Sequence, residues 1–167
     1  MNVQRNQKIV LQALDLFQQY YHNQISQLLH NFPAEQLTSQ GVKFWSGTKR
    51  CPHALDYDVN NPTHFEFVYA ASILRAQQYR LEPIMDRSRI AEIAKSFAPE
   101  PFQPRSGVRI AVTEEEASAQ DNMEDDTETQ VEQLKLSLAR LNIRTTLNSI
   151  DFEKDDDTNH HMEFVTA

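Results

Sequence analysis

Apolar residues recur at steps of three and four along the N-terminal part of the chain, which is the spacing of one face of an α-helix. This stripe consists of Val10, Leu14, Phe17, Tyr21, Ile25, Leu28 and Phe32. Pro33 follows it, and proline cannot continue a helix because it lacks the backbone N–H. We therefore expect one long amphipathic helix that ends before Pro33 and buries the stripe in the core.

Shorter patterns predict further helices. One should begin at Pro62, whose fixed φ suits the first helical position, with Asn61 as its cap. Two more are indicated by apolar residues at helical spacing, namely Ile90, Ile93, Ala94 and Phe97, and later Val131, Leu134, Leu138 and Leu141. The former should end at a proline cluster formed by Pro99, Pro101 and Pro104.

Two short stretches alternate between apolar and polar residues, which is typical of strands: residues 54–59, and Val108, Ile110 and Val112. Residues 38–47 should form turns around an aromatic anchor, Phe44-Trp45. Together the patterns predict a mainly α fold with minor β, a single compact helical domain with a few short strands.

One phrase occurs twice. His64-Phe65-Glu66-Phe67-Val68-Tyr69-Ala70 returns as His161-Met162-Glu163-Phe164-Val165-Thr166-Ala167, with five of seven positions identical. Each copy follows a polar approach, at 58–61 and at 155–158. The first copy continues with helical spacing, whereas the second stops about one turn after it begins. We therefore expect the chain to be a piece of a larger protein.

Composition narrows the possible functions. The chain has 167 residues, a net charge of −8 and one cysteine. One cysteine excludes an internal disulfide framework, and no apolar run is long enough for a signal peptide or a membrane span. The negative charge argues against nucleic-acid binding, because no basic stripe is available to contact phosphates. We expect a cytoplasmic or nuclear protein without a membrane or nucleic-acid partner.

The acidic residues concentrate between Arg109 and Lys135, where no basic residue interrupts them. Such a run buries too little apolar surface to offset the entropy of ordering it. We therefore interpret residues 114–127 as an acidic mobile loop. The alternative is an acidic binding segment that attracts a basic partner electrostatically, and the composition favours this alternative less.

Candidate chemistry is sparse. The three glycines are isolated, so no glycine-rich loop is available to hold a phosphate. The six histidines are scattered or adjacent, which suits capping or surface roles better than metal ligation. Asp155, Asp156 and Asp157 suit Mg²⁺, but we prefer to place them at the positive end of the second-copy helix. The sequence thus predicts no metal site and no bound cofactor.

Cys51 is a candidate nucleophile, because Lys49, Arg50 and His53 surround it and positive charge favours a thiolate. A lone intracellular cysteine is more often a structural side chain, and neighbours in sequence do not define geometry. We predict from the residues that Cys51 is structural.

Five strings resemble, in the same order, the second catalytic-cysteine half-domain of the ubiquitin-activating enzyme. They are QLLHNFP at 27–33, FWSGTKRCP at 44–52, DVNNPTH at 58–64, FQPRSGV at 102–108 and DFEKDDDTNHHM at 151–162. The resemblance covers nearly the whole chain. It is weakest over 1–10, 84–98 and the acidic stretch with the helix that follows it.

The resemblance implies a parent enzyme that adenylates ubiquitin with Mg-ATP, holds it as a cysteine thioester and passes it to a conjugating enzyme. In that family the nucleophile lies in an upstream Pro-x-Cys-Thr segment, which this chain lacks. Cys51 does not match that segment, so the resemblance implies that Cys51 is not catalytic. It also implies that the fragment is inactive alone and binds no ATP.

The resemblance assigns roles to two further segments. Residues 151–167 would form a connector toward the adenylation domain, and residues 1–167 would form the C-terminal part of the half-domain. Thr113 and Glu114 would lie near the thioester site, although they match the family's pair inexactly. The remaining alternative is a stand-alone helical interaction module with shared ancestry. In either case we expect a monomer.

Overall fold

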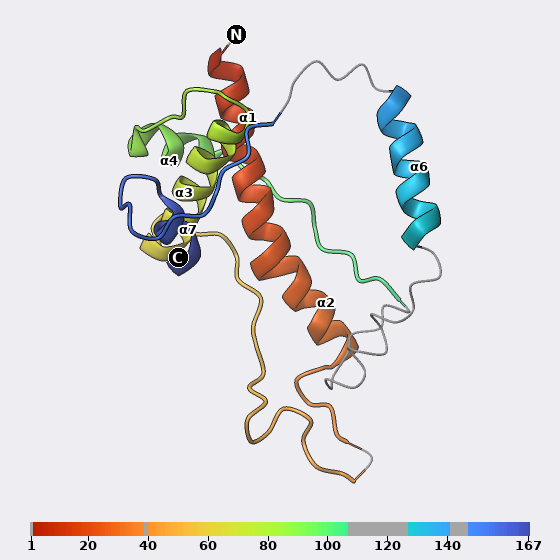
Figure 1. Ribbon diagram of the computed structural model, residues 1–167. Helices are drawn as coiled ribbons and strands as arrows, with labels where there is room; N and C mark the ends of the chain where they lie inside the picture. The colour runs from red at the N-terminus through yellow and green to blue at the C-terminus, as the bar shows by residue number, and fades with distance from the viewer. Residues whose placement is uncertain (1, 39, 107–126, 141–146) are drawn as a thin grey trace. The chain divides into compact units, whose positions relative to one another are not determined.

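The computed structural model describes residues 2–38, 40–106, 127–140 and 147–167 (Figure 1). The chain divides into two compact units. The first consists of Met1–Arg105 with Leu147–Ala167, and the second consists of Ser106–Thr146. Among the described residues, no helix combines the length and apolar character that a membrane span requires.

The first unit begins with the predicted long helix, in three consecutive parts. They are α1 (Asn2–Phe17), the π-helical η1 (Gln18–Asn23) and α2 (Gln24–Asn31). The helix ends before Pro33, as expected. The apolar spacing does not reveal the π-helical turn, which is a rare structure that often marks functional regions.

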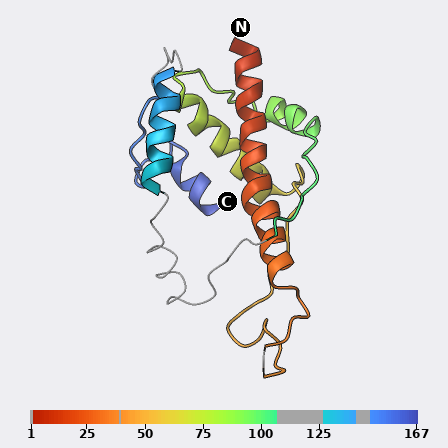
Figure 2. The ribbon, with the colours of Figure 1, turned by 90° about the vertical axis from the view of Figure 1, so that its right-hand side faces the viewer.

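The predicted apolar stripe is buried only in its first half. Val10, Leu14 and Phe17 are almost completely buried, whereas α2 contains no buried residue. The expectation that the whole stripe lies in the core is therefore wrong for its second half. The reason is tertiary: α1 packs against α3 (Pro62–Gln78) and α4 (Arg87–Lys95), which Figure 2 shows on either side of it, while irregular segments meet α2.

The predicted start of α3 is confirmed. Asn61 caps α3 by accepting hydrogen bonds from the backbone N–H groups of Thr63 and His64, and Pro62 occupies the first turn. Asp86 caps α4 in the same way. The α4 helix buries Ile90, Ile93 and Ala94 and ends at Lys95, ahead of the proline cluster.

Aromatic rings form the centre of the first unit. Phe17 has its ring centroid 4.9 Å from that of Tyr21, 5.4 Å from Tyr57 and 5.8 Å from Phe67. Edge-to-face and tilted contacts of this kind add to the free energy gained from burying the rings. The core therefore joins the end of α1, the segment before α3, and α3 itself.

The strand predicted at 54–59 is not a strand. Leu55, Tyr57 and Val59 do point alternately toward the core, which explains the alternation in the sequence. Their neighbour is a helix, however: the Leu55 N–H donates to the Tyr21 carbonyl oxygen at 2.9 Å, within η1. Among the described residues the β-structure is a single bridge between Leu37 and Lys43, and the strand predicted at 108–112 lies outside them.

The remaining helices are α6 (Thr127–Arg140) in the second unit and α7 (His161–Thr166) in the first. The prediction of a helix around Val131, Leu134 and Leu138 is confirmed, but these side chains are exposed. Residues 114–126 of the predicted acidic loop and Leu141 lie outside the described residues. A mainly α fold is confirmed.

Candidate functional site

The first copy of the repeated phrase starts α3 through a set of local hydrogen bonds. An Asp58 carboxylate oxygen accepts from the Asn60 N–H at 2.8 Å, which forms a turn before the Asn61 cap. The His64 ring then folds back, and its Nδ1 accepts from the Asp58 N–H at 3.2 Å. Side chains of the approach and of the phrase therefore satisfy backbone donors that no helical carbonyl can reach.

The second copy starts α7 in the same way. The Asp156 carboxylate accepts from the Thr158 N–H at 2.8 Å, and the Asn159 side-chain oxygen accepts from the His161 N–H at 2.8 Å. The buried His161 ring folds back, and its Nδ1 accepts from the Glu153 N–H at 2.9 Å. A ring nitrogen that accepts cannot carry the proton, so this hydrogen bond requires the neutral tautomer with the proton on Nε2; Nδ1 also lies 3.2 Å from the Glu153 carbonyl oxygen.

The two copies touch at the same position of the phrase. Phe67 in the first and Phe164 in the second have ring centroids 5.2 Å apart, with planes inclined at 32°. This contact docks α7 on α3, next to the rings of Phe17 and Tyr21. The sequence revealed the repeat, but it carried no signal that the two copies pack against each other.

The two helix starts differ by one residue. Two residues separate the capping Asn61 from His64, whereas His160 alone separates Asn159 from His161. His160 adopts a left-handed conformation with φ 63°, while Asn61 is extended with φ −78°. We attribute the left-handed turn to the shorter spacing, since one fewer residue must bring the same groups together.

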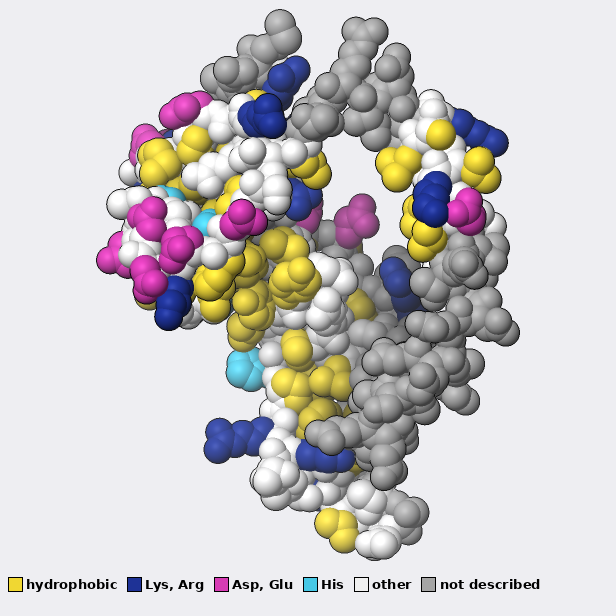
Figure 3. All heavy atoms as spheres, viewed as in Figure 1, with side chains coloured by type: hydrophobic (Ala, Val, Ile, Leu, Met, Phe, Trp, Pro, Cys, Tyr) yellow, Lys and Arg dark blue, Asp and Glu magenta, His cyan; other side chains and the backbone are white. Residues whose placement is uncertain are grey.

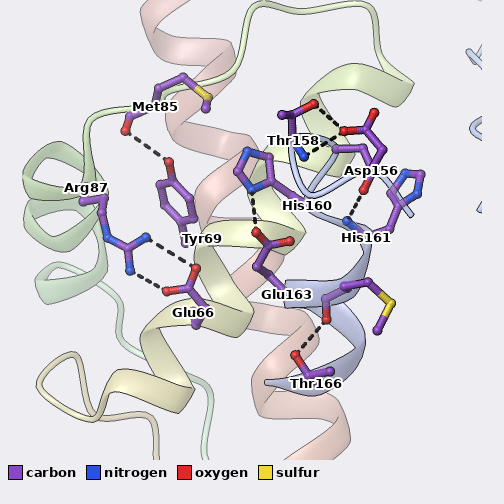
Figure 4. Close-up of polar contacts among 12 residues, drawn as sticks. Glu66, Tyr69, Met85, Arg87, Asp156, Thr158, His160, His161, Glu163 and Thr166 are labelled. Carbon is purple, nitrogen blue, oxygen red and sulfur yellow. Dashed lines mark hydrogen bonds and ion pairs between the residues drawn. The ribbon is translucent and has the colours of Figure 1, made fainter. Parts of the chain in front are cut away.

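His160 also contacts two residues of the docked helices. Its ring lies edge-on to Tyr69, with centroids 5.7 Å apart, and its Nδ1 lies 3.7 Å from a Glu163 carboxylate oxygen (Figure 4). The latter distance is too long for a hydrogen bond. The contact becomes an ion pair only when His160 is protonated.

The matching glutamate of the first copy joins α3 to α4. Glu66 pairs with the Arg87 guanidinium, which also lies over the rings of Phe65 and Tyr69, 4.9 and 4.4 Å from their centroids (Figure 4). The Tyr69 hydroxyl donates to the Met85 carbonyl oxygen at 3.3 Å. The hydrogen bonds that Arg87 donates to Glu66 raise the pKa of Arg87, so this cation stays charged.

The segment that leads to α7 carries exposed acidic side chains, and Figure 3 shows acidic groups gathered beside an apolar area of the first unit. Asp156 is held by Thr158, whose hydroxyl donates at 2.6 Å, and these hydrogen bonds lower the pKa of the Asp156 carboxyl. Asn159 serves the first turn of α7 instead. The Asp156 carboxylate caps the preceding turn, and the expectation that Asp155, Asp156 and Asp157 sit at the positive end of the second-copy helix stays a prediction.

The remaining predicted site residues are placed as follows. Cys51 is exposed, with its Sγ 3.6 Å from the Pro52 carbonyl oxygen, and the Lys49 ammonium lies over the Phe44 ring at 4.7 Å. Thr113 and Glu114 lie outside the described residues. Among the residues that the structure covers, no three His, Cys, Asp or Glu side chains are grouped to hold a metal ion.

Two features that sequence reasoning missed involve α2 and η1. Gln27 holds the backbone of Arg105, and His22 lies 3.1 Å from the Asp56 carboxylate. Each pair joins distant parts of the sequence. Only the shared membership of Gln27 and Arg105 in strings of the resemblance could have drawn attention to the first pair.

The fold and its paired helix starts define an α-helical module in which the C-terminal segment returns to the core and packs α7 on α3. The family model described as "Ubiquitin-activating enzyme, SCCH domain" matches residues 2–167, so the chain belongs to this family, the second catalytic-cysteine half-domain. The resemblance found in the sequence is thereby confirmed.

Curated relatives agree with this assignment. The chain is 47% identical over 149 residues to "Ubiquitin-like modifier-activating enzyme 1" of Homo sapiens, covering 88% of this chain and 14% of the relative. It is 41% identical over 159 residues to "Ubiquitin-activating enzyme E1 1" of Candida albicans and 34% identical over 160 residues to "Ubiquitin-activating enzyme E1 2" of Triticum aestivum. Each of these two matches covers 90% of this chain and 15% of the relative. The chain thus spans about one seventh of these relatives.

Proposed function

We propose that this chain is part of a ubiquitin-activating enzyme that adenylates ubiquitin, carries it as a cysteine thioester and passes it to a conjugating enzyme. Within that enzyme the chain shapes the thioester domain and does not supply the nucleophile. Family membership and relatives that bear the name ubiquitin-activating enzyme support this proposal. The compartment that we propose is the cytoplasm and nucleus.

The proposed role of the fragment rests on one observation, namely the hydrogen bonds that residues 151–167 form among themselves. Their turns are closed by their own hydrogen bonds, such as those from the Asn159 amide to the Glu153 carbonyl oxygen and from Thr158 to Asp156. Their attachment to the core runs through α7, above all through Phe164 on Phe67. A segment that folds through its own hydrogen bonds and joins the core through one short helix suits a connector between domains that move during a catalytic cycle.

The described residues do not fit Mg-ATP. They include no glycine-rich loop at a helix start, since Gly41 and Gly47 are isolated in turns, and they contain no group of acidic side chains arranged for a metal ion. We therefore assign nucleotide binding to the adenylation domain of the parent enzyme. The isolated chain should accordingly show no saturable binding of Mg-ATP by calorimetry.

Substitution of Cys51 tests the proposed location of the nucleophile. In the full-length parent enzyme, Cys51→Ala should retain ATP-dependent ubiquitin thioester formation to within a few-fold, because loss of a true nucleophile abolishes a covalent step. Replacing the cysteine of the upstream Pro-x-Cys-Thr segment is the matched control. It should remove the thioester while adenylate formation continues. Loss of the thioester in a folded Cys51→Ala enzyme would place the nucleophile in this chain.

A second candidate is a stand-alone helical interaction module. The observation in its favour is α6, where Val131, Leu134, Leu136 and Leu138 are all more than 40% exposed. If α6 were the functional element of an independent module, changing Leu134 and Leu138 to Gln would abolish the biological effect of the chain. In the parent enzyme we instead expect these changes to leave adenylation intact.

A further inference from the structure

The second half of the N-terminal stripe is an apolar helix face that the first unit leaves uncovered. Ile25, Leu28 and Leu29 lie on one side of α2, and each of them is only partly buried. None of the three belongs to the buried core cluster or packs against it. Figure 1 shows α2 extending beyond α3, α4 and α7, and among the described elements it packs extensively only on η1, which it continues.

The same part of the chain carries no charge. No Lys, Arg, Asp or Glu occurs between Asp15 and Glu35, although these residue types make up 24% of the chain. A helix at the surface ordinarily carries charged side chains opposite its apolar face. In α2 that opposite side carries neutral groups instead, namely Gln24, Ser26 and His30. Depletion of charge is typical of the centre of a protein interface.

The uncovered face continues the core of the first unit without a break. Leu14 and Phe17 of α1 are almost completely buried, and the Tyr21 ring lies 4.9 Å from the Phe17 ring between centroids. Ile25 follows Tyr21 along the same stripe. Permanent interfaces are more hydrophobic than transient ones and resemble a core cut in half. A stripe that runs from a covered into an uncovered part of one helix therefore indicates a permanent partner.

We propose that this face of α2 binds a segment of the parent enzyme that lies outside this chain. The segment is apolar and uncharged where it meets Ile25, Leu28 and Leu29, since a charged group there would lose its hydration and α2 offers no opposite charge. This inference rests on the proposed function, because it requires the parent enzyme.

The length of the relatives supports a partner within the same polypeptide. The chain spans about one seventh of its curated relatives, so the proposed parent enzyme contains much further polypeptide. A large apolar face that stayed open to water in the folded parent would favour aggregation. A segment of the same polypeptide covers the face permanently and at any protein concentration.

Hydrogen exchange of backbone amides tests whether the parent enzyme covers the face. The amides of α2 should exchange roughly ten-fold more slowly in the parent enzyme than in the 167-residue chain, because an uncovered helix opens locally more often. Mass spectrometry of peptides from residues 24–31 measures the rates in both proteins. The buried part of α3 is the internal reference, and its rates should differ less than about two-fold between the two proteins.

A matched pair of substitutions tests the face itself. Ile25→Glu places a charge on the proposed interface, whereas Gln24→Glu places the same charge on an exposed position roughly 100° away around the helix. In the parent enzyme, Ile25→Glu should raise the exchange rate of α2 roughly ten-fold, and Gln24→Glu should leave it unchanged. In the 167-residue chain both substitutions should change that rate less than about three-fold, since Ile25 is already partly exposed there.

Ile25→Gln is the milder variant for the case that the Ile25→Glu parent enzyme does not fold. It removes the apolar contact without adding a charge and should raise the exchange rate of α2 about three-fold in the parent enzyme. An unchanged rate in this variant would contradict the proposed contact at Ile25.

Three results with the wild-type proteins would overturn the proposal. Equal exchange of α2 in the chain and in the parent enzyme would show that the face stays open. Slow exchange in the chain only at concentrations where analytical ultracentrifugation detects a dimer would assign the face to a second copy. Slow exchange in the parent enzyme only after addition of ubiquitin or a conjugating enzyme would assign it to a separate protein.

Failure of the proposed function would give a different result, namely a folded parent enzyme that forms no ubiquitin thioester with ATP. Hydrogen exchange of α2 does not depend on that activity. It would still report whether the rest of the parent polypeptide covers the face.

Discussion

The two copies of the repeated phrase have similar hydrogen-bonded starts and very different surroundings. In the first copy, α3 is a long helix that buries Phe67, Val68 and Ala70 against α1. In the second copy, α7 is one short helix whose Phe164 is only partly buried. Similar local hydrogen bonds therefore set the residue at which each helix begins. Tertiary packing decides how much each contributes to the free energy of unfolding.

Truncation of the paired rings should give the largest difference between the copies. Phe67→Ala removes a ring that is 3% exposed and contacts Phe17, Tyr21 and Phe164. The substitution should therefore lower the free energy of unfolding by about 3–5 kcal/mol. Phe164→Ala should cost about 1–2 kcal/mol, because its site is partly open to solvent. Urea unfolding of both variants measures the difference. Equal costs would mean that α7 belongs to the core as fully as α3 does.

Removal of the capping asparagines should give a smaller difference. Asn61→Ala leaves the N–H groups of Thr63 and His64 without their acceptor, at a cost of about 1–2 kcal/mol. Asn159→Ala should cost about 0.5–1 kcal/mol, because α7 can fray without opening the core. Asn61→Asp is the matched control, since an aspartate also caps. Recovery by this control in urea unfolding would confirm that the cap, and not packing, is responsible.

The segment before the first copy should make the protein sensitive to alkali. Burial, and then the charge of Asp58, raise the pKa of Tyr57 from 10.0 to about 12. The folded state thus holds the phenolic proton more tightly than the unfolded state. The resulting contribution to the free energy of unfolding is fully present below pH 10 and is lost as the pH rises toward 12. Urea unfolding at a series of pH values should show this loss in the wild type.

Tyr57→Phe should abolish that alkaline loss. At neutral pH the variant should be as stable as the wild type or slightly more so, since the Tyr57 hydroxyl is buried without a hydrogen-bond partner among the described residues. Ultraviolet absorbance of tyrosinate would report the ionisation directly. A variant with the wild-type alkaline profile would contradict the assignment to Tyr57.

The segment before the second copy should respond to acid instead. Hydrogen bonds from the Thr158 hydroxyl and N–H lower the pKa of Asp156 below its ordinary 3.8. The unfolded state therefore binds this proton more tightly. The contribution of the Asp156 carboxylate to the free energy of unfolding is present above pH 3.8. It disappears as the pH falls through the lower pKa that this group has in the folded state.

The effect of Asp156 should be small, because its carboxylate is fully exposed to solvent. Thr158→Val removes the hydroxyl donor, so it should move the Asp156 carboxyl resonance toward its ordinary titration in an NMR pH series. An unchanged titration would show that the Thr158 N–H alone lowers the pKa.

The smallest expected effect concerns His160, where the second copy is one residue shorter. A left-handed backbone conformation destabilises a residue that has a side chain by about 1 kcal/mol relative to glycine. His160→Gly also loses the contact with Tyr69, so the net gain should be about 0.5 kcal/mol or less. Asn61→Gly, at a position with ordinary φ, should instead lower the free energy of unfolding by a few tenths of a kcal/mol, because it removes the helix cap.

The sequence by itself determined what depends on neighbouring residues. Helix periods, the Asn61 cap with Pro62, the stop before Pro33 and the two copies of the phrase were all readable, since each rests on contacts within a few residues. Family membership was readable too, because several strings occurred in the expected order. The spacing of apolar residues could show which residues face inward, but not what they face.

Only the tertiary structure decided what those inward faces meet. Residues 54–59 alternate like a strand, yet a π-helical turn and not another strand receives the Leu55 N–H. Half of the N-terminal stripe lies outside the core because no helix packs there among the described residues. The contacts of Phe67 with Phe164 and of Gln27 with Arg105 join positions 97 and 78 residues apart. Such pairs depend on how the whole chain folds back, and that information is not contained in any local pattern.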